Sequence, residues 1–250
     1  MQKLMGQMRK AITDYNMIEN GDRICVGVSG GKDSVALITG LAGLKRFIGI
    51  DFTIVGITLD PRFNNLDGNY EPMVDFCKSH NVEYKIIKTD IGQIVFDIRK
   101  EEHPCSLCAR MRRGALHDAA LKHGCNKVAL GHHKDDAIET FFMNLFNEGR
   151  IGCFSPISYL SRKDLTLIRP LVYAQEKDII TAVKRNNLPI VKSICPADGC
   201  TSRQGMKEYI AQMQNKDENF KNKIFGAMQR SGIDRWGIGE NTKSNVKGLF

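Results

Sequence analysis

Four short apolar runs, each rich in β-branched residues, recur along the first half of the chain. Stretches with helical spacing separate these runs, which read ICVGVS (24–29), FTIVGITL (52–59), VEYKIIK (82–88) and KVALGH (127–132). Strands that alternate with helices predict a mostly parallel sheet covered on both faces. We therefore predict an α/β, doubly wound fold, in which ligands bind beyond the carboxyl ends of the strands.

The remaining segments complete the predicted organisation. The opening residues place Leu4, Met8 and Ile12 at helical intervals, which predicts an N-terminal helix within 1–22. The α/β domain follows over residues 23–190, with a hairpin near 157–169 and a helix over about 175–187. Residues 191–250 are predicted to be mostly helical and to end in a polar, mobile tail.

Net charge and hydropathy limit the kinds of partner and the cellular compartment that we expect for this protein. The net charge of +8 favours a polyanionic partner, although many basic proteins have none. No apolar run approaches the roughly 18 residues that span a bilayer, and the first residues lack the apolar stretch of a signal peptide. We therefore predict a cytoplasmic protein with no membrane partner, whose eight cysteines are reduced.

A glycine pair follows the first predicted strand in the hexapeptide SGGKDS. Its glycines permit close backbone approach, and the N–H groups of the following helix attract an anion. It is not the nucleoside-triphosphate loop of the Walker type, because only three residues separate Gly27 from Gly31 and Asp33 follows Lys32 where a hydroxyl is needed. The simplest alternative is an ordinary strand-to-helix turn capped by Asp33 or Ser34.

The whole hexapeptide resembles the PP-loop of the adenine nucleotide α-hydrolase-like superfamily (HUP-type fold), whose pattern is Ser-Gly-Gly-x-Asp-Ser. The resemblance implies that ATP binds here and that the loop holds the departing pyrophosphate. The implied loop residues are Ser29, Gly30, Gly31, Lys32, Asp33 and Ser34. Similar enzymes also imply adenosine contacts after the second and fourth strands, at Leu59, Asp60, Gly131 and His132.

The fourth predicted strand runs into the motif GHHKDDAIET. Adjacent carboxylates with a third acid one turn later, at Asp135, Asp136 and Glu139, are suited to Mg²⁺. The alternative is a helix start whose acids only favour the helix dipole. The motif closely resembles the second signature of PP-loop tRNA thiolases, which makes Asp135 and Asp136 candidates for Mg²⁺ binding or for activation of the base. Asp33, together with Asp136, is the predicted Mg²⁺ pair.

Three cysteines stand in contexts that suit a metal centre. Cys105 and Cys108 form a Cys-x-x-Cys at a predicted helix start, and Cys195 lies in SICPADGC. The spacing alone leaves zinc and iron–sulfur equally open, with His103 or Cys200 available to complete a zinc site. A thiol-redox motif is the weakest alternative, because the pair does not open a thioredoxin-like fold. The isolated cysteines are predicted to be small core residues: Cys25, Cys77, Cys125 and Cys153.

A more specific resemblance is carried by YNMIENGDRICVGVSGGKDS, PCSLCARMRRGAL, VALGHHKDDAIETFFMNLF and IRPLVYAQEKDI. Together these segments look like the tRNA 2-thiocytidine synthetase family and cover most of residues 1–200. That family implies a [4Fe–4S] cluster on Cys105, Cys108 and Cys195. Aligning the glycine of the family's Cys-x-x-Cys-Gly with Gly199 favours Cys195 over Cys200 as the third ligand.

The implied reaction is ATP-dependent insertion of sulfur into cytidine 32 of the tRNA anticodon loop. The C2 oxygen would be adenylated first, and sulfide or a persulfide-carrying donor would then displace AMP. The implied catalytic residues are Lys32, Asp135, Asp136 and Arg112. Arg110 and Arg113 flank Arg112 and would hold tRNA phosphate or the adenylate, unless they form only a solvated helix face. A homodimer is common among similar proteins.

Three other functions remain open from the sequence. A thiolase of the same superfamily would act on a tRNA uridine, but the first 24 and last 50 residues lack the extra cysteine modules common in those enzymes. A cluster-free PP-loop ligase or amidotransferase would have no need of the three cysteines. A non-catalytic, zinc-stabilised tRNA-binding module would leave the full PP-loop unexplained.

Overall fold

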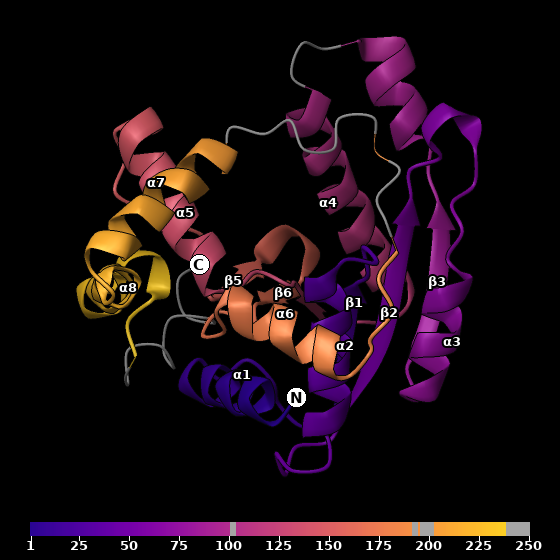
Figure 1. The fold of residues 1–250 in the computed structure, drawn as a ribbon. Helices are drawn as coiled ribbons and strands as arrows, with labels where there is room; N and C mark the ends of the chain where they lie inside the picture. Colours follow the sequence, from indigo (N-terminus) through magenta and orange to yellow (C-terminus); the bar gives the residue numbers. More distant parts are fainter. Residues whose placement is uncertain (101–103, 192–194, 196–202, 239–250) are drawn as a thin grey trace.

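The fold is a six-stranded sheet covered by helices, as the alternating pattern predicts (Figure 1). The computed structural model describes residues 1–100, 104–191, 195 and 203–238. The strand order is β3-β2-β1-β4-β6-β5, and every neighbouring pair is parallel except the β5–β6 hairpin. The strands are β1 (Asp22–Gly27), β2 (Phe52–Asp60), β3 (Glu83–Lys88), β4 (Lys127–Ala129), β5 (Ile157–Leu160) and β6 (Leu165–Ile168).

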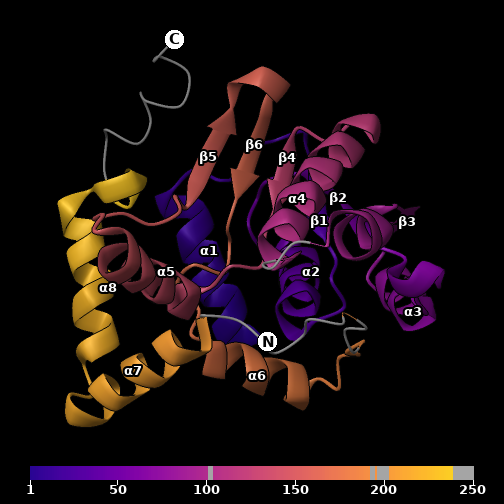
Figure 2. The same ribbon diagram turned by 90° about the horizontal axis from the view of Figure 1, so that it is seen from above.

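Helices alternate with the strands and then close the chain. They are α1 (Gln2–Asp14), α2 (Lys32–Leu44), α3 (Glu71–Ser79), α4 (Pro104–Lys122), α5 (Lys134–Glu148), α6 (Glu176–Arg185), α7 (Arg203–Lys216) and α8 (Phe220–Ser231). A π-helical turn, Gln93–Arg99, precedes α4, and short 3-10 turns lie at Phe63–Asn65, Ser161–Lys163 and Ile233–Arg235. Both views place α5, α7 and α8 together at one end of the sheet and α3 at the other (Figures 1 and 2).

The strands β1, β2 and β4 are buried on both faces, whereas the edge strand β3 is largely exposed. Neighbouring side chains of a strand point to opposite faces of the sheet. In β1, Ile24 and Val26 join the core that includes α1, α2 and α6, whereas Cys25 joins the core against α4. In β4, Val128 and Ala129 divide in the same way. This two-sided burial explains why the sequences of β1, β2 and β4 are nearly continuous apolar runs.

The two ends of the described chain share the larger core. α1 packs on α2 and α6, and the Tyr15 hydroxyl donates to the main-chain oxygen of Trp236 at 3.0 Å. Trp236 is fully buried and its indole N–H donates to Phe154 O at 2.8 Å. The predicted N-terminal helix is therefore part of the main core. The predicted mobile tail lies outside the described residues from 239 onward.

Candidate active site

The glycine pair forms the turn from β1 into α2. Gly30 has a φ of +79°, in the left-handed region that favours glycine, and Gly31 is the N-cap of α2 with a φ of −77°. No side chain in the described part of the chain caps α2, so the N–H groups of its first turn are available to an anion at this end of the helix. The Ser34 hydroxyl donates to Gly31 O at 2.9 Å and Ser29 Oγ accepts from Gly31 N–H at 3.3 Å, which holds the loop shape.

Lys32 lies between two carboxylates at the mouth of this loop. Its Nζ is 3.1 Å from Asp33 Oδ2 and 3.0 Å from Glu176 Oε1, at the start of α6. Burial lowers the pKa of Lys32, but the two carboxylates more than offset burial and the net pKa is raised. The lysine therefore stays cationic and is available to a phosphate group.

The fourth strand brings the GHHKDD motif directly against the PP-loop. A side chain at Gly131 would place its Cβ only 3.2 Å from Asp33 Cβ, so glycine permits this close approach. The buried His133 is the N-cap of α5, and its N–H donates to Asp136 Oδ2 at 2.9 Å. The His133 Nε2 atom lies 3.8 Å from Asp33 Oδ1 and 3.4 Å from Asp136 Oδ2. Asp33 and Asp136 therefore face the same histidine.

One atom of this group fits the predicted Mg²⁺. Asp33 Oδ1 is buried and has no hydrogen-bond partner among the described residues. A buried carboxylate oxygen without a partner is costly unless a cation or water completes it. The orphaned oxygen, with Asp136 nearby, suits the carboxylate-and-phosphate ligand set of Mg²⁺.

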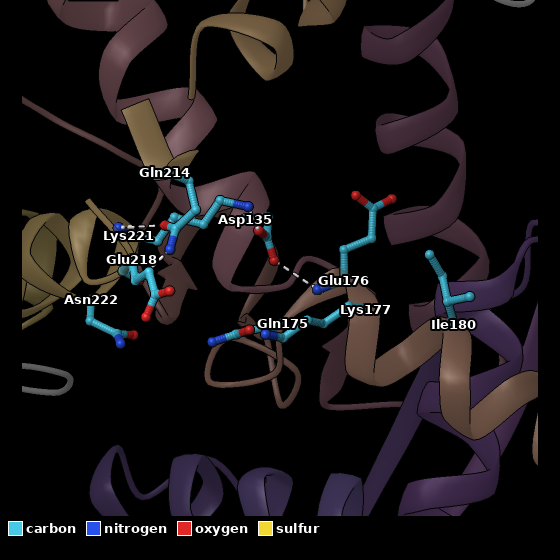
Figure 3. Close-up of a pocket in the computed structure, with 9 residues that line it drawn as sticks. All are labelled: Asp135, Gln175, Glu176, Lys177, Ile180, Gln214, Glu218, Lys221 and Asn222. Carbon is cyan, nitrogen blue, oxygen red and sulfur yellow. Dashed lines mark hydrogen bonds and ion pairs between the residues drawn. The ribbon is translucent and has the colours of Figure 1, made fainter. Parts of the chain in front are cut away.

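Asp135 is bound by residues of α6 and α8. Its Oδ2 accepts from Glu176 N–H at 2.7 Å and its Oδ1 from Lys221 Nζ at 2.6 Å (Figure 3). Burial raises the pKa of Asp135, but Lys221 and the Glu176 amide outweigh burial and hold it below its usual value. Both oxygens thus tie α5 to α6 and α8, beside a pocket of about 390 Å³. Its predicted catalytic role remains a prediction.

Glu139, one turn into α5, is a second buried acid, and it forms ion pairs with two cations of α7. Its Oε2 lies 3.5 Å from Arg203 Nε and its Oε1 lies 3.9 Å from Lys207 Nζ. Burial is the main cause that raises the pKa of Glu139 to about 7. Arg203 also reaches Asp136 at 3.4 Å and Thr140 at 3.2 Å. Sequence reasoning missed both cations, because Arg203 and Lys207 lie more than sixty residues beyond Glu139.

We expect Glu139→Gln to flatten the dependence of stability on pH. The pKa of Glu139 is about 7 in the folded chain against an ordinary value of 4.5, so its contribution to folding is fully present below pH 4.5 and is lost as the pH rises to about 7. In the parent this loss lowers the free energy of unfolding by on the order of 1–3 kcal/mol. Urea unfolding at pH 4.5 to 8.5 measures it, with the exposed Glu148→Gln of the same helix as control. An unchanged pH slope in Glu139→Gln would contradict this assignment.

His132 is held by a residue that sequence reasoning did not single out. Arg169, directly after β6, is buried, and its Nε–H donates to His132 Nδ1 at 3.2 Å. The Phe154 ring lies 4.9 Å from the His132 ring and 4.9 Å from Arg169 Cζ. Burial, followed by the Arg169 charge, lowers the pKa of His132 to about 4. Only its position in the sequence could have indicated Arg169, because this residue directly follows a strand whose carboxyl end borders the site.

The end of β2 is closed by the loop that follows it. The buried Asp60 accepts from the N–H groups of Arg62 and Gly68, each at 3.0 Å. Burial, followed by the Asp60 charge, raises the pKa of Tyr70 to about 12. The half-buried Leu59 packs with the core against α4. Asp60 organises this loop, and the adenosine contacts of Leu59 and Asp60 remain predictions.

The Cys-x-x-Cys occupies the first turns of α4, as predicted. Cys105 is exposed, whereas Cys108 is buried against Ile91 and Val95. Burial is the main cause that raises the pKa of Cys108; Arg112 lowers this pKa, and charge on Cys195 and on Cys105 raises it further. Cys105 and Cys195 therefore both lie close enough to Cys108 to influence its pKa. His103 and Cys200, the other candidates, lie outside the described residues.

The cysteine environment also adjoins the PP-loop. Val191 N–H donates to Gly30 O at 3.0 Å, and Cys195 follows four residues later, a span of at most about 14 Å. Within the described residues, no three Cys, His, Asp or Glu side chains converge as ligands of one ion. The other four cysteines are buried, which confirms their prediction as core residues: Cys25, Cys77, Cys125 and Cys153.

Three arginines follow the cysteines along α4. Arg110, Arg112 and Arg113 are exposed. Arg112 lies close enough to Tyr70 and Cys108 to affect the pKa of both, and Arg113 acts on Arg169. The described residues give none of the three an ion pair, so their charge is available to an anion in the space beyond the strand ends.

Comparison with known proteins agrees with this geometry. A family model described as a PP-loop domain matches residues 2–212, so fold and site define a PP-loop protein. The chain is 40% identical over 224 residues to a tRNA-cytidine(32) 2-sulfurtransferase of Dichelobacter nodosus, which covers 89% of this chain and 83% of that protein. The Geobacter metallireducens protein of the same name is 34% identical over 229 residues, covering 90% and 88%. The chain belongs to the tRNA-cytidine(32) 2-sulfurtransferase family, which confirms the resemblance found in the sequence.

A solved structure shares the fold. The U34-tRNA thiolase NcsA from Methanococcus maripaludis with its [4Fe–4S] cluster superposes with a TM-score of 0.70 at 21% identity, over 98% of this chain and 79% of that one. At this identity the likeness supports the fold alone, and it confirms the predicted α/β class. Among the residues described here, no helix combines the length and the apolar character needed to cross a membrane.

Proposed function

We propose that this enzyme thiolates cytidine 32 of tRNA at C2 in two steps, both driven by ATP. The single observation that carries the proposal is the meeting of three elements at one edge of the sheet. The PP-loop contacts the start of α5 through Asp33 and His133, and it contacts the segment that leads to Cys195 through Val191. The family relatives support the choice of cytidine 32.

In the first step the C2 oxygen of the base attacks the α-phosphorus of ATP. A P–O bond forms to the base, the bond to the β-phosphate oxygen breaks, and pyrophosphate leaves. The N–H groups at the start of α2 and the cationic Lys32 would bind the pyrophosphate and stabilise its charge as it departs. Asp33 and Asp136 would hold Mg²⁺, which neutralises phosphate charge.

In the second step sulfide attacks C2 and AMP leaves with the former base oxygen. Activation is needed because a carbonyl oxygen is a poor leaving group, whereas AMP is a good one. Cys105, Cys108 and Cys195 would hold a [4Fe–4S] cluster, which with three protein ligands leaves one iron open to bind sulfide. Arg112, between Cys108 and the loop after β2, would bind the phosphate of the adenylated base.

The direct test is reconstitution. Anaerobically prepared protein is incubated with ATP, Mg²⁺, sulfide and unmodified tRNA, and the nucleosides are analysed by mass spectrometry. We expect 2-thiocytidine together with AMP and pyrophosphate. Appearance of 2-thiouridine instead would establish the uridine alternative, and AMP formation without any thiolated base would favour a ligase.

Arg113→Ala should weaken tRNA binding without affecting ATP binding. Its exposed guanidinium lies among the three arginines of α4, and one lost phosphate contact lowers the salt dependence of binding by about one counterion. The measurement is tRNA affinity at several salt concentrations. Arg185→Ala, an exposed arginine at the far end of α6, is the matched control. Equal salt slopes for Arg113→Ala and the parent would exclude Arg113 from the interface.

A further inference from the structure

Arg169 is a buried cation without a carboxylate partner among the described residues. Its Nη1 donates to Ser155 O at 2.5 Å and its guanidinium covers the Phe154 ring, so its position is fixed from two sides. The Arg169 Nε–H donates to His132 Nδ1 at 3.2 Å. Placing a guanidinium in the interior is costly unless it is well paired, so this bond requires a functional explanation.

The direction of that bond determines the chemistry of His132. A guanidinium only donates, so Nδ1 of His132 must accept and can carry no proton. The imidazole proton then lies on Nε2, and the ring is neutral. A second proton on Nδ1 would face the positive Arg169, and burial beside Phe154 disfavours a charged ring further.

The location of His132 indicates which group its Nε2–H can bind. His132 follows Gly131, whose backbone lies against Asp33 of the PP-loop, and it precedes His133, the cap of α5. A neutral Nε2–H at this edge suits an anionic oxygen of the nucleotide. It does not suit proton abstraction from the base, since the only basic nitrogen of the ring is occupied.

We propose that Arg169 is a positioning residue that locks His132 into the neutral tautomer with its proton on Nε2, so that His132 serves the nucleotide as a hydrogen-bond donor and not as a base. The inference rests on the proposed function for its ligand, ATP. The tautomer itself is a property of the free chain and is measured without tRNA or sulfide.

The test uses full-length protein labelled with ¹⁵N-histidine. Long-range ¹H–¹⁵N spectra, with His132 assigned by loss of its signals in His132→Asn, report which ring nitrogen carries the proton. In the parent we expect the shifts of an unprotonated Nδ1 and a protonated Nε2. A proton on Nδ1, or a doubly protonated ring at pH 7, would overturn the proposal.

Arg169→Met supplies the second readout. Methionine keeps an unbranched apolar stem against Phe154 but cannot donate to Nδ1. We expect mixed His132 tautomers and about tenfold weaker binding of a non-hydrolysable ATP analogue. Arg162→Met, an exposed arginine in the turn of the β5–β6 hairpin, is the matched control and should change neither.

Two results would separate the two hypotheses. If Arg169→Met leaves the His132 spectrum of the folded protein unchanged, Arg169 does not set the tautomer. If the spectrum changes as expected while the parent makes no thiolated tRNA, the tautomer assignment stands and the proposed function fails.

Discussion

Gly30→Ala is expected to reduce ATP binding by roughly 10- to 100-fold. A side chain at this position must adopt a φ of +79°, and its Cβ would lie 2.9 Å from Val191 Cβ. The strained conformation costs on the order of 1–3 kcal/mol, and relief by changing φ would turn the N–H groups of the loop away from the phosphates. Isothermal titration with a non-hydrolysable ATP analogue measures the loss.

Substitutions at two other glycines distinguish backbone strain from crowding of the phosphate as the cause of weaker ATP binding. Gly31 has a φ of −77°, and its nearest contact would be Ser29 Oγ at 3.4 Å, so Gly31→Ala should fold normally and report only crowding of the phosphate. Gly6→Ala on the exposed face of α1 meets nothing within 4 Å and should bind ATP as the parent does. It should gain roughly 0.5–1 kcal/mol of stability. Parent-like ATP affinity in Gly30→Ala would refute the role of the loop.

Cys105→Ala should remove the iron–sulfur centre without disturbing the fold. The Cys105 side chain is exposed at the start of α4, so its truncation leaves no cavity. Loss of even an outer partner of a metal site costs about 10–100-fold in metal affinity, and loss of a ligand should cost at least as much. Iron and acid-labile sulfide per chain after anaerobic reconstitution should fall from about four toward zero, and thiolation should stop.

The controls use the same residue type. Cys125→Ala, in the core against α4, should keep its iron and lose only about 1 kcal/mol of stability. Cys195→Ala and Cys200→Ala compare the two candidates for the third ligand, and we expect only the former to lose iron. One zinc per chain in the parent, with no iron, would overturn the cluster assignment.

The sequence predicted those parts of the molecule that depend on local patterns. The four predicted runs became β1 to β4. The runs of β1, β2 and β4 are buried on both faces of the sheet and need no partner information to be recognised, whereas β3 is a largely exposed edge strand. The hairpin, the helix over α6 and the Cys-x-x-Cys at a helix start also lie where they were predicted. The fourth strand is shorter than predicted, since after Leu130, whose N–H still donates to Ile168 O, the chain approaches Asp33 at Gly131.

The parts that escaped prediction depend on contacts between distant segments. His133 caps α5, although histidine is not among the usual capping residues. Lys221 binds Asp135 across 86 positions, and Arg169 binds His132 across 37. No periodicity or composition signals such pairs, because only the fold brings their side chains together.

The bond from Val191 N–H to Gly30 O has a consequence for how this chain can vary. Since a main-chain amide is the donor, substitution at position 191 alters the packing on the glycine but preserves the link. Proline alone among the natural amino acids lacks that hydrogen. Sequence drift at position 191 can therefore change the packing on Gly30 while the main-chain bond to the glycine loop persists.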